Sequence, residues 1–137
     1  MAASLVLIAD NDHAVSSLLA EVLNRSGLRT VCAYDGEVAG RRAMGRDISV
    51  LVCDLDMPKR TGLEMLEALP AGVAPPTIIV SGYLDQAIEA RLSALPCVRA
   101  ILQKPFDLFA FAELVQRLAR EGRDGAADAV AAGGTEH

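Results

Sequence analysis

Short apolar runs alternate along the chain with segments in which apolar residues recur every three or four positions. The runs are bounded by turn-forming or acidic residues, which predicts β-strands over Leu5–Ala9, Thr30–Ala33, Ile48–Cys53, Thr77–Val80 and Val98–Leu102. The segments between and after them predict helices from Asp12 to Gly27 and over Glu37–Met44, Leu63–Leu69, Gln86–Leu95 and Asp107–Arg120. Five successive βα units predict an α/β fold, a doubly wound parallel five-stranded sheet with helices on both faces.

This pattern accounts for residues 1–121 as one domain. Residues 122–137 contain few large apolar side chains, and we expect a flexible Ala- and Gly-rich tail there, with a weak helix over 126–132 as the alternative. The tail is too short to form a DNA-binding or enzymatic domain, so no second domain is expected.

Composition excludes several classes of function. The net charge of −5 disfavours direct binding to nucleic acid, and no run of about 18 apolar residues is present that could span a membrane. No basic region precedes the first apolar run, so we expect no signal peptide. Cys32, Cys53 and Cys97 are spaced unlike zinc ligands or a disulfide framework, which is typical of reduced thiols in a cytoplasmic protein.

Polar side chains follow four of the predicted strands at their carboxyl ends, where sheets of this type bind ligands. They are Asp10, Asn11 and Asp12 after the first strand, Asp54 after the third, Ser81 after the fourth and Lys104 after the fifth. Carboxylates can hold Mg²⁺, a hydroxyl and an ammonium can hold phosphoryl oxygens, and a carboxylate can itself accept a phosphoryl group. Each residue alone could be a helix cap or a turn residue, but their joint placement favours a phosphoryl site.

Three segments resemble the receiver domain of bacterial two-component response regulators. D-L-D-M-P-K-R-T-G, residues 54–62, matches the family's phosphoacceptor pattern D-x-x-M-P-x-x-[DST]-G and follows an apolar strand. V-S-G-Y, residues 80–83, matches the family's switch Ser/Thr segment, and K-P-F, residues 104–106, matches its Lys-Pro-Phe segment. The resemblance covers about residues 4–121. Within the family, the chain is similar to the single-domain chemotaxis receivers. The resemblance implies a flavodoxin-like fold with strand order 2-1-3-4-5.

The resemblance implies that Asp54 is the nucleophile that takes a phosphoryl group from a sensor histidine kinase or a phosphotransfer protein. Mg²⁺ would be bound by Asp54, by the acidic pair at positions 10 and 11, and by the backbone carbonyl of Asp56. Position 11 departs from the family because it is Asn11, whose amide oxygen brings no charge. We therefore expect weak binding of Mg²⁺, with Mn²⁺ as an alternative ion and with Asp12 or Asp56 compensating in part.

The remaining roles also come from the resemblance. Lys104 would hold a phosphoryl oxygen, and Ser81 would rotate inward to bond the phosphoryl group. The peptide bond before Pro105 would be cis. The family often has a switch Tyr or Phe three residues before the lysine, and that position is Ile101 here. Tyr83 is a candidate to replace the missing aromatic, with a simple loop aromatic as the alternative.

Output would then pass through contacts with a downstream protein that the sequence does not identify. In the family, the output surface is made by the fourth helix, the fifth strand and the fifth helix, and the same face could support a weak homodimer of an otherwise monomeric protein. The polar residues predicted on this face are Gln86, Glu89, Arg91, Arg99, Glu113, Gln116, Arg117 and Arg120.

Two other interpretations remain open. A pseudo-receiver, an interaction module that is not phosphorylated, is favoured by Asn11 and Ile101. A phosphatase of the haloacid dehalogenase type also uses an Asp-x-Asp after a strand, followed by Ser/Thr and Lys. Here the Asp-x-Asp follows the third strand and the chain lacks room for a cap, so we expect no enzyme activity beyond self-catalysed phosphoryl transfer and dephosphorylation.

Overall fold

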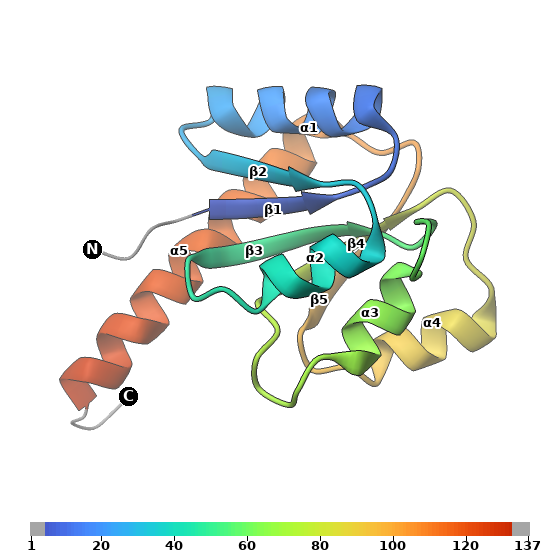
Figure 1. The fold of residues 1–137 in the computed structure, drawn as a ribbon. Helices are drawn as coiled ribbons and strands as arrows, with labels where there is room; N and C mark the ends of the chain where they lie inside the picture. The colour runs from blue at the N-terminus through green and yellow to red at the C-terminus, as the bar shows by residue number, and fades with distance from the viewer. Residues whose placement is uncertain (1–4, 133–137) are drawn as a thin grey trace.

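The computed structural model describes residues 5–132 and consists of five βα units (Figure 1). The strands are β1 (Leu5–Ala9), β2 (Arg29–Ala33), β3 (Ile48–Asp54), β4 (Thr77–Ser81) and β5 (Val98–Gln103). The helices are α1 (His13–Arg25), α2 (Gly36–Ala43), α3 (Gly62–Ala68), α4 (Gln86–Ser93) and α5 (Leu108–Ala132). Each strand lies within one residue of its predicted bounds at either end.

The strands form one parallel sheet in the order β2-β1-β3-β4-β5, which confirms the predicted flavodoxin-like topology. The register decides which strand ends meet. Ala9 of β1 lies beside Cys53 of β3. The residues that come next in the chain, Asp10 and Asp54, therefore also lie side by side. Asp54 is also level with Val80 of β4, which places the end of β4 next to the two acids.

Two apolar layers cover the sheet (Figure 1). Helices α1 and α5 pack on one face through aliphatic and aromatic side chains such as Leu19, Leu23 and Phe111, all fully or almost fully buried. Helices α2, α3 and α4 cover the other face, where Met65 and Leu92 are fully buried. Burial on both faces explains why β1, β3 and β4 are almost continuously apolar.

All five helices begin at the edge of the sheet where the strands end, and each has a side-chain cap. At α5 the cap is Asp107, whose Oδ1 accepts hydrogen bonds from the N–H groups of Phe109 and Ala110. Asp12, Asp35 and Asp85 accept hydrogen bonds from the first free N–H groups of α1, α2 and α4. Thr61 and Glu64 form a reciprocal capping box at the start of α3. These caps fix the βα loops that surround the strand ends.

The largest departure from the predicted elements is at α5. It was expected to end at Arg120, but its backbone continues as a helix to Ala132. The added segment is rich in alanine, the residue with the highest helix propensity, which explains why the expected tail is helical over 122–132. Residues 133–137 of that tail lie outside the described residues. No helix in the described part of the chain is long and apolar enough to cross a membrane.

Candidate functional site

Asp10 and Asp54 lie side by side at the carboxyl edge of the sheet, and both are almost completely buried. Their exposed fractions are 1% and 6%. Each carboxylate accepts a backbone hydrogen bond from the loop that follows its strand: Asp12 N–H donates to Asp10 Oδ1 at 2.9 Å, and Asp56 N–H donates to Asp54 Oδ1 at 2.9 Å. The second oxygen of each acid is thereby left for other partners.

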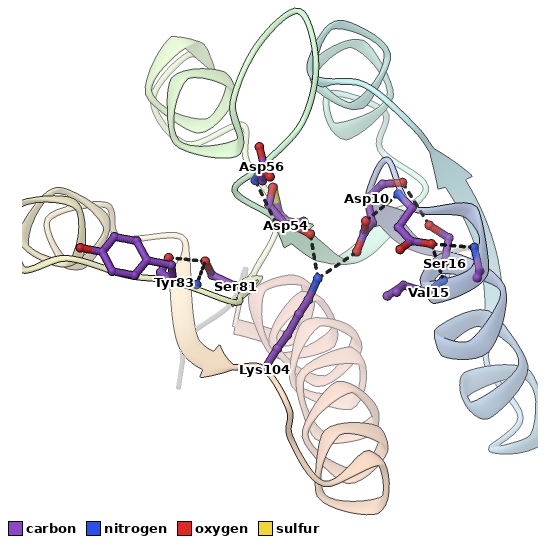
Figure 2. A network of polar contacts seen from close by, with 11 residues as sticks. Asp10, Val15, Ser16, Asp54, Asp56, Ser81, Tyr83 and Lys104 are labelled. Carbon is purple, nitrogen blue, oxygen red and sulfur yellow. Dashed lines mark hydrogen bonds and ion pairs between the residues drawn. The ribbon is translucent and has the colours of Figure 1, made fainter.

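Lys104 is that partner for both acids. Its Nζ lies 2.8 Å from Asp54 Oδ2 and 3.5 Å from Asp10 Oδ2, and Figure 2 shows its side chain reaching up from the end of β5 between them. The peptide bond between Lys104 and Pro105 is cis, which confirms the expectation from the sequence. Three of the predicted residues, carried by three different strands, therefore meet in one cluster.

The electrostatics of the cluster leave an excess of negative charge, because two carboxylates face one ammonium. Burial raises the pKa of Asp10, more than the hydrogen bond from Asp12 lowers it, and the charge of Asp54 raises it further. Burial opposes the charged form of Lys104, but its hydrogen bond to Asp54 and the charges of both acids outweigh burial and raise the pKa of Lys104. The lysine is thus held protonated as the internal counter-ion of the two acids.

A surface hollow of about 530 Å³ opens beside this cluster. Its lining comes from the loops after β3 and β4 and from the end of β5: Asp54, Leu55, Asp56, Ser81, Gly82, Tyr83, Ile88 and Lys104. The hollow therefore connects the carboxylate of Asp54 and the ammonium of Lys104 with solvent. A phosphoryl group bound there would meet a carboxylate and an ammonium at once.

Asn11 and Asp12, the neighbours of Asp10, are both exposed. Asp12 caps α1, with its Oδ1 accepting from the N–H groups of Ala14 at 3.0 Å and Val15 at 3.2 Å. Its carboxylate is therefore engaged with the helix start, which argues against Asp12 as a substitute for the missing acid at position 11. Among the side chains that the structure describes, no three of His, Cys, Asp or Glu gather as a metal-binding group.

The donor set still fits a hard cation. The two buried carboxylates carry more negative charge than Lys104 neutralises, and oxygen donors are what Mg²⁺ prefers. The carboxylate of Asp10 is disfavoured by its burial, so a positive charge bound beside it would relieve that cost. Asn11 can add only a neutral amide oxygen to this set.

Ser81 is in the lining of the hollow, but its hydroxyl is directed to its own loop. Ser81 Oγ donates to the carbonyl of Tyr83 at 2.6 Å and accepts from the Tyr83 N–H at 3.2 Å. In Figure 2 this pair stands apart from Asp54 and Lys104. The Tyr83 side chain is among the most exposed apolar groups of the described residues, at 74%. Ile101, in contrast, is half-buried and packs against the core.

Two backbone features hold the loop after β3. Gly62 begins α3, where a Cβ atom would lie 2.5 Å from the carbonyl oxygen of Asp54, so only glycine allows the helix to approach the strand end this closely. Gly62 N–H also donates to the carbonyl of Leu55 at 3.0 Å. Close packing against the end of β3 thus explains why the last residue of the D-x-x-M-P-x-x-[DST]-G pattern is glycine in this chain.

Sequence reasoning missed Ser16. Its hydroxyl, fully buried, donates to the backbone carbonyl of Asp10 at 3.1 Å and so ties α1 to the end of β1 (Figure 2). Ser16 lies next to the apolar stripe of α1, and a single serine in an amphipathic helix gives no signal of such a contact. The sequence could have indicated it only as a polar residue on the covered face of the helix.

The predicted output face is only partly as expected. Arg91 of α4 pairs with Glu67 of α3, and Arg99 of β5 pairs with Glu121 of α5 at 2.9 Å. The assignment of Gln116 to this face is wrong, because its amide donates to the carbonyl of Ser26 at the end of α1, at 2.9 Å. α5 turns this residue toward α1.

The chain belongs to the response regulator receiver domain family, whose model matches residues 6–119. Members of this family are modules of two-component signal transduction, are generally not enzymes and typically bind Mg²⁺. Membership removes the support for the phosphatase interpretation.

Curated relatives are longer than this chain. The transcriptional regulatory protein CpxR of Escherichia coli K12 is 33% identical over 105 residues, which cover 74% of this chain and 43% of CpxR. Response regulator RR06 of Streptococcus pneumoniae is 25% identical over 115 residues, covering 84% of this chain and 52% of that protein. The chain thus spans about half or less of the length of these relatives.

Solved structures agree with the topology. A response regulator receiver protein from Pseudomonas putida is 28% identical with a TM-score of 0.77, covering 85% of this chain and 98% of that one. A CheY-like receiver domain protein from Methanospirillum hungatei, 20% identical, has a TM-score of 0.80 and covers 90% of this chain and 99% of its own. The second likeness concerns the fold alone.

Proposed function

We propose that the chain is a phosphoaccepting receiver in which Asp54 takes a phosphoryl group from a phosphohistidine of a kinase or phosphotransfer protein. The observation that carries the proposal is the position of Asp54: it is the buried acid that lines the hollow, and it is hydrogen-bonded to Lys104 at 2.8 Å. The proposal includes residues 1–121 as the receiver domain, with the cytoplasm as its location.

In this reaction a carboxylate oxygen of Asp54 attacks the phosphorus atom, and the P–N bond to the imidazole breaks as the new O–P bond forms. Asp56 N–H keeps its hydrogen bond to Oδ1 and holds the carboxylate in one orientation. Lys104, already at the attacking acid, donates to the phosphoryl oxygens. Positioning and charge neutralisation are the main contributions that a protein makes to phosphoryl transfer.

A divalent cation would be held by the carboxylates of Asp10 and Asp54, by the backbone carbonyl of Asp56 and by the amide oxygen of Asn11. Bound Mg²⁺ or Mn²⁺ supplies positive charge that offsets the negative charge of the acids and of the phosphoryl group. Because Asn11 is neutral, we propose that the affinity is low.

Ser81 would report the modification. To bond the phosphoryl group, its hydroxyl has to give up both hydrogen bonds to the Tyr83 backbone, so the loop after β4 would move with it. The negative charge of the phosphoryl group would thus shift the loop after β4 between two arrangements. The change would reach a downstream protein, or a second copy in a weak homodimer, through α4, β5 and α5.

An intact-mass measurement tests the proposal. The protein is incubated with acetyl phosphate and Mg²⁺, and one added phosphoryl mass is expected. Asp54→Asn should abolish the addition. Asp107→Asn is the matched control and should still gain the phosphoryl mass, because Asp107 is exposed, caps α5 and is not in the lining of the hollow.

One observation favours the pseudo-receiver as a second candidate. Position 11 is neutral and exposed, and the nearest spare acid, Asp12, caps α1, so the cation site has one acid fewer than the family pattern. An unchanged mass across millimolar Mg²⁺ and Mn²⁺ would favour this candidate over phosphorylation.

A further inference from the structure

Tyr34 and Asp35, which connect β2 to α2, and Gly36, the first residue of α2, lie between the segments that follow the two acids. We name residues 34–36 the brace. The strand order places β2 next to β1, and β3 on the other side of β1. The brace nevertheless contacts His13, the first residue of α1, and the loop after β3, so it spans the edge of the sheet at which Asp10 and Asp54 lie.

On the β1 side the contacts are a stacked pair and a backbone hydrogen bond. The rings of His13 and Tyr34 are 3.8 Å apart between centroids and inclined by only 10°. Asp10 N–H donates to the carbonyl of Ala33, the residue before the brace, at 3.0 Å. Both contacts fix the segment from Asp10 to the first residue of α1.

On the β3 side the contacts are tighter. Gly36 N–H donates to the carbonyl of Pro58 at 3.2 Å, and Asp35 Oδ2 lies 3.7 Å from Lys59 Nζ. A Cβ atom on Gly36 would stand 2.0 Å from the carbonyl oxygen of Arg60, a distance at which one backbone has to move. The brace is therefore in direct backbone contact with the phosphoacceptor loop.

We propose that the brace couples the two acid-bearing loops, so that Tyr34, Asp35 and Gly36 act as positioning residues for the site. Only the consequence of the brace for phosphoryl transfer rests on the proposed function. The sheet fixes the positions of Asp10 and Asp54 themselves. Asn11 and Asp56 lie in the loops beyond the strands, and the brace connects these two regions. None of the three residues touches the reacting atoms.

Hydrogen exchange in the metal-free protein measures this coupling directly. The N–H groups of Asp12 and Asp56 report on the two loops, because each is bonded to the carboxylate of its own strand end. Gly36→Ala should raise the exchange rate of both amides at least tenfold. Gly40→Ala is the matched control on the same helix, since its Cβ would meet only the flexible Met65 side chain at 3.2 Å, and it should leave both rates within about twofold.

If Gly36→Ala does not fold, substitutions of exposed side chains can still test the coupling by hydrogen exchange. Tyr34→Ala removes the stacked ring and should raise the exchange rate of Asp12 by about 2- to 10-fold, the range that an aromatic pair contributes. The decisive reporter is the amide across the brace: Asp56 should also exchange faster in Tyr34→Ala. Phe109→Ala, an exposed aromatic on α5, should change neither amide.

An effect of Tyr34→Ala confined to Asp12 would overturn the coupling, as would equal rates in Gly36→Ala and Gly40→Ala. A second readout, the rate of mass addition from acetyl phosphate, should fall in the brace variants and not in Gly40→Ala. If wild-type protein gains no phosphoryl mass, the proposed function fails, while the exchange rates still decide the brace.

Discussion

Lys104→Met removes the ammonium that pairs with both buried acids, and we expect a large loss of stability at neutral pH. At an effective dielectric constant of 20, a unit charge 2.8 Å from Lys104 Nζ interacts by about 6 kcal/mol and one at 3.5 Å by about 5 kcal/mol. Desolvation of the ammonium offsets much of this attraction because most of the Lys104 side chain is buried, and solvent at its 30% exposed part screens the charges further. We expect a net loss of about 3 kcal/mol, since the variant leaves buried carboxylates without a partner.

Urea unfolding followed by circular dichroism, in buffer with a chelator, measures the loss, which corresponds to about 10 °C in Tm for a domain of this size. Lys59→Met is the matched control, because Lys59 is the chain's one other lysine and its side chain, 3.7 Å from Asp35, is 59% exposed. Exposed pairs contribute little, so the control should stay close to wild type. Equal losses in the two variants would refute the reasoning.

The pH dependence gives a second check on Lys104→Met. The folded-state pKa of Asp10 is raised above its unfolded value, so this acid favours the folded state most when protonated, and that contribution is lost as pH rises through the folded-state pKa. Without Lys104 the pKa of Asp10 rises further. The stability difference between variant and wild type should therefore be largest near neutral pH and shrink in acid.

Three further predictions concern single positions. Asn11→Asp should tighten Mg²⁺ binding at least about tenfold by calorimetry, because a charge at about 4 Å is worth roughly 4 kcal/mol before desolvation; equal titrations would mean that position 11 is not at the cation. Asp10→Asn should raise the stability of the metal-free protein at pH 7, with the gain shrinking as pH falls through the Asp10 pKa; a gain independent of pH would contradict the assigned cause. Gly62→Ala should cost about 1–3 kcal/mol in urea unfolding, because its Cβ would lie 2.5 Å from the Asp54 carbonyl oxygen, and wild-type stability would argue against that contact.

The fold could be read from the sequence because the periodicity of apolar residues is strong. Each of the five apolar runs is a strand in the structure, and burial of both sheet faces explains why β1, β3 and β4 are almost continuously apolar. The end of α5 could not be predicted this way, since residues 122–132 are helical in an Ala-rich segment that offers few apolar side chains to a core. Intrinsic propensity is the only signal there.

The residues of the site could be predicted only from the rule that ligands bind at the carboxyl ends of the strands. That rule brings Asp10, Asp54 and Lys104 together, as the structure has them. It does not say where a side chain points, so the engagement of Ser81 with the Tyr83 backbone had no signal in the sequence. Such choices depend on rotamers and loop geometry, which spacing along the chain does not determine. The position of Asp12 directly before the first helix does predict an N-cap, and the structure confirms it.

The most direct test of the central claim is to locate the modified residue. After incubation with acetyl phosphate and Mg²⁺, proteolysis and tandem mass spectrometry should find one phosphoryl group, on Asp54, and chelation of the metal should prevent it. A phosphoryl group on another residue, or none at any Mg²⁺ or Mn²⁺ concentration, would contradict the assignment of Asp54 as the acceptor.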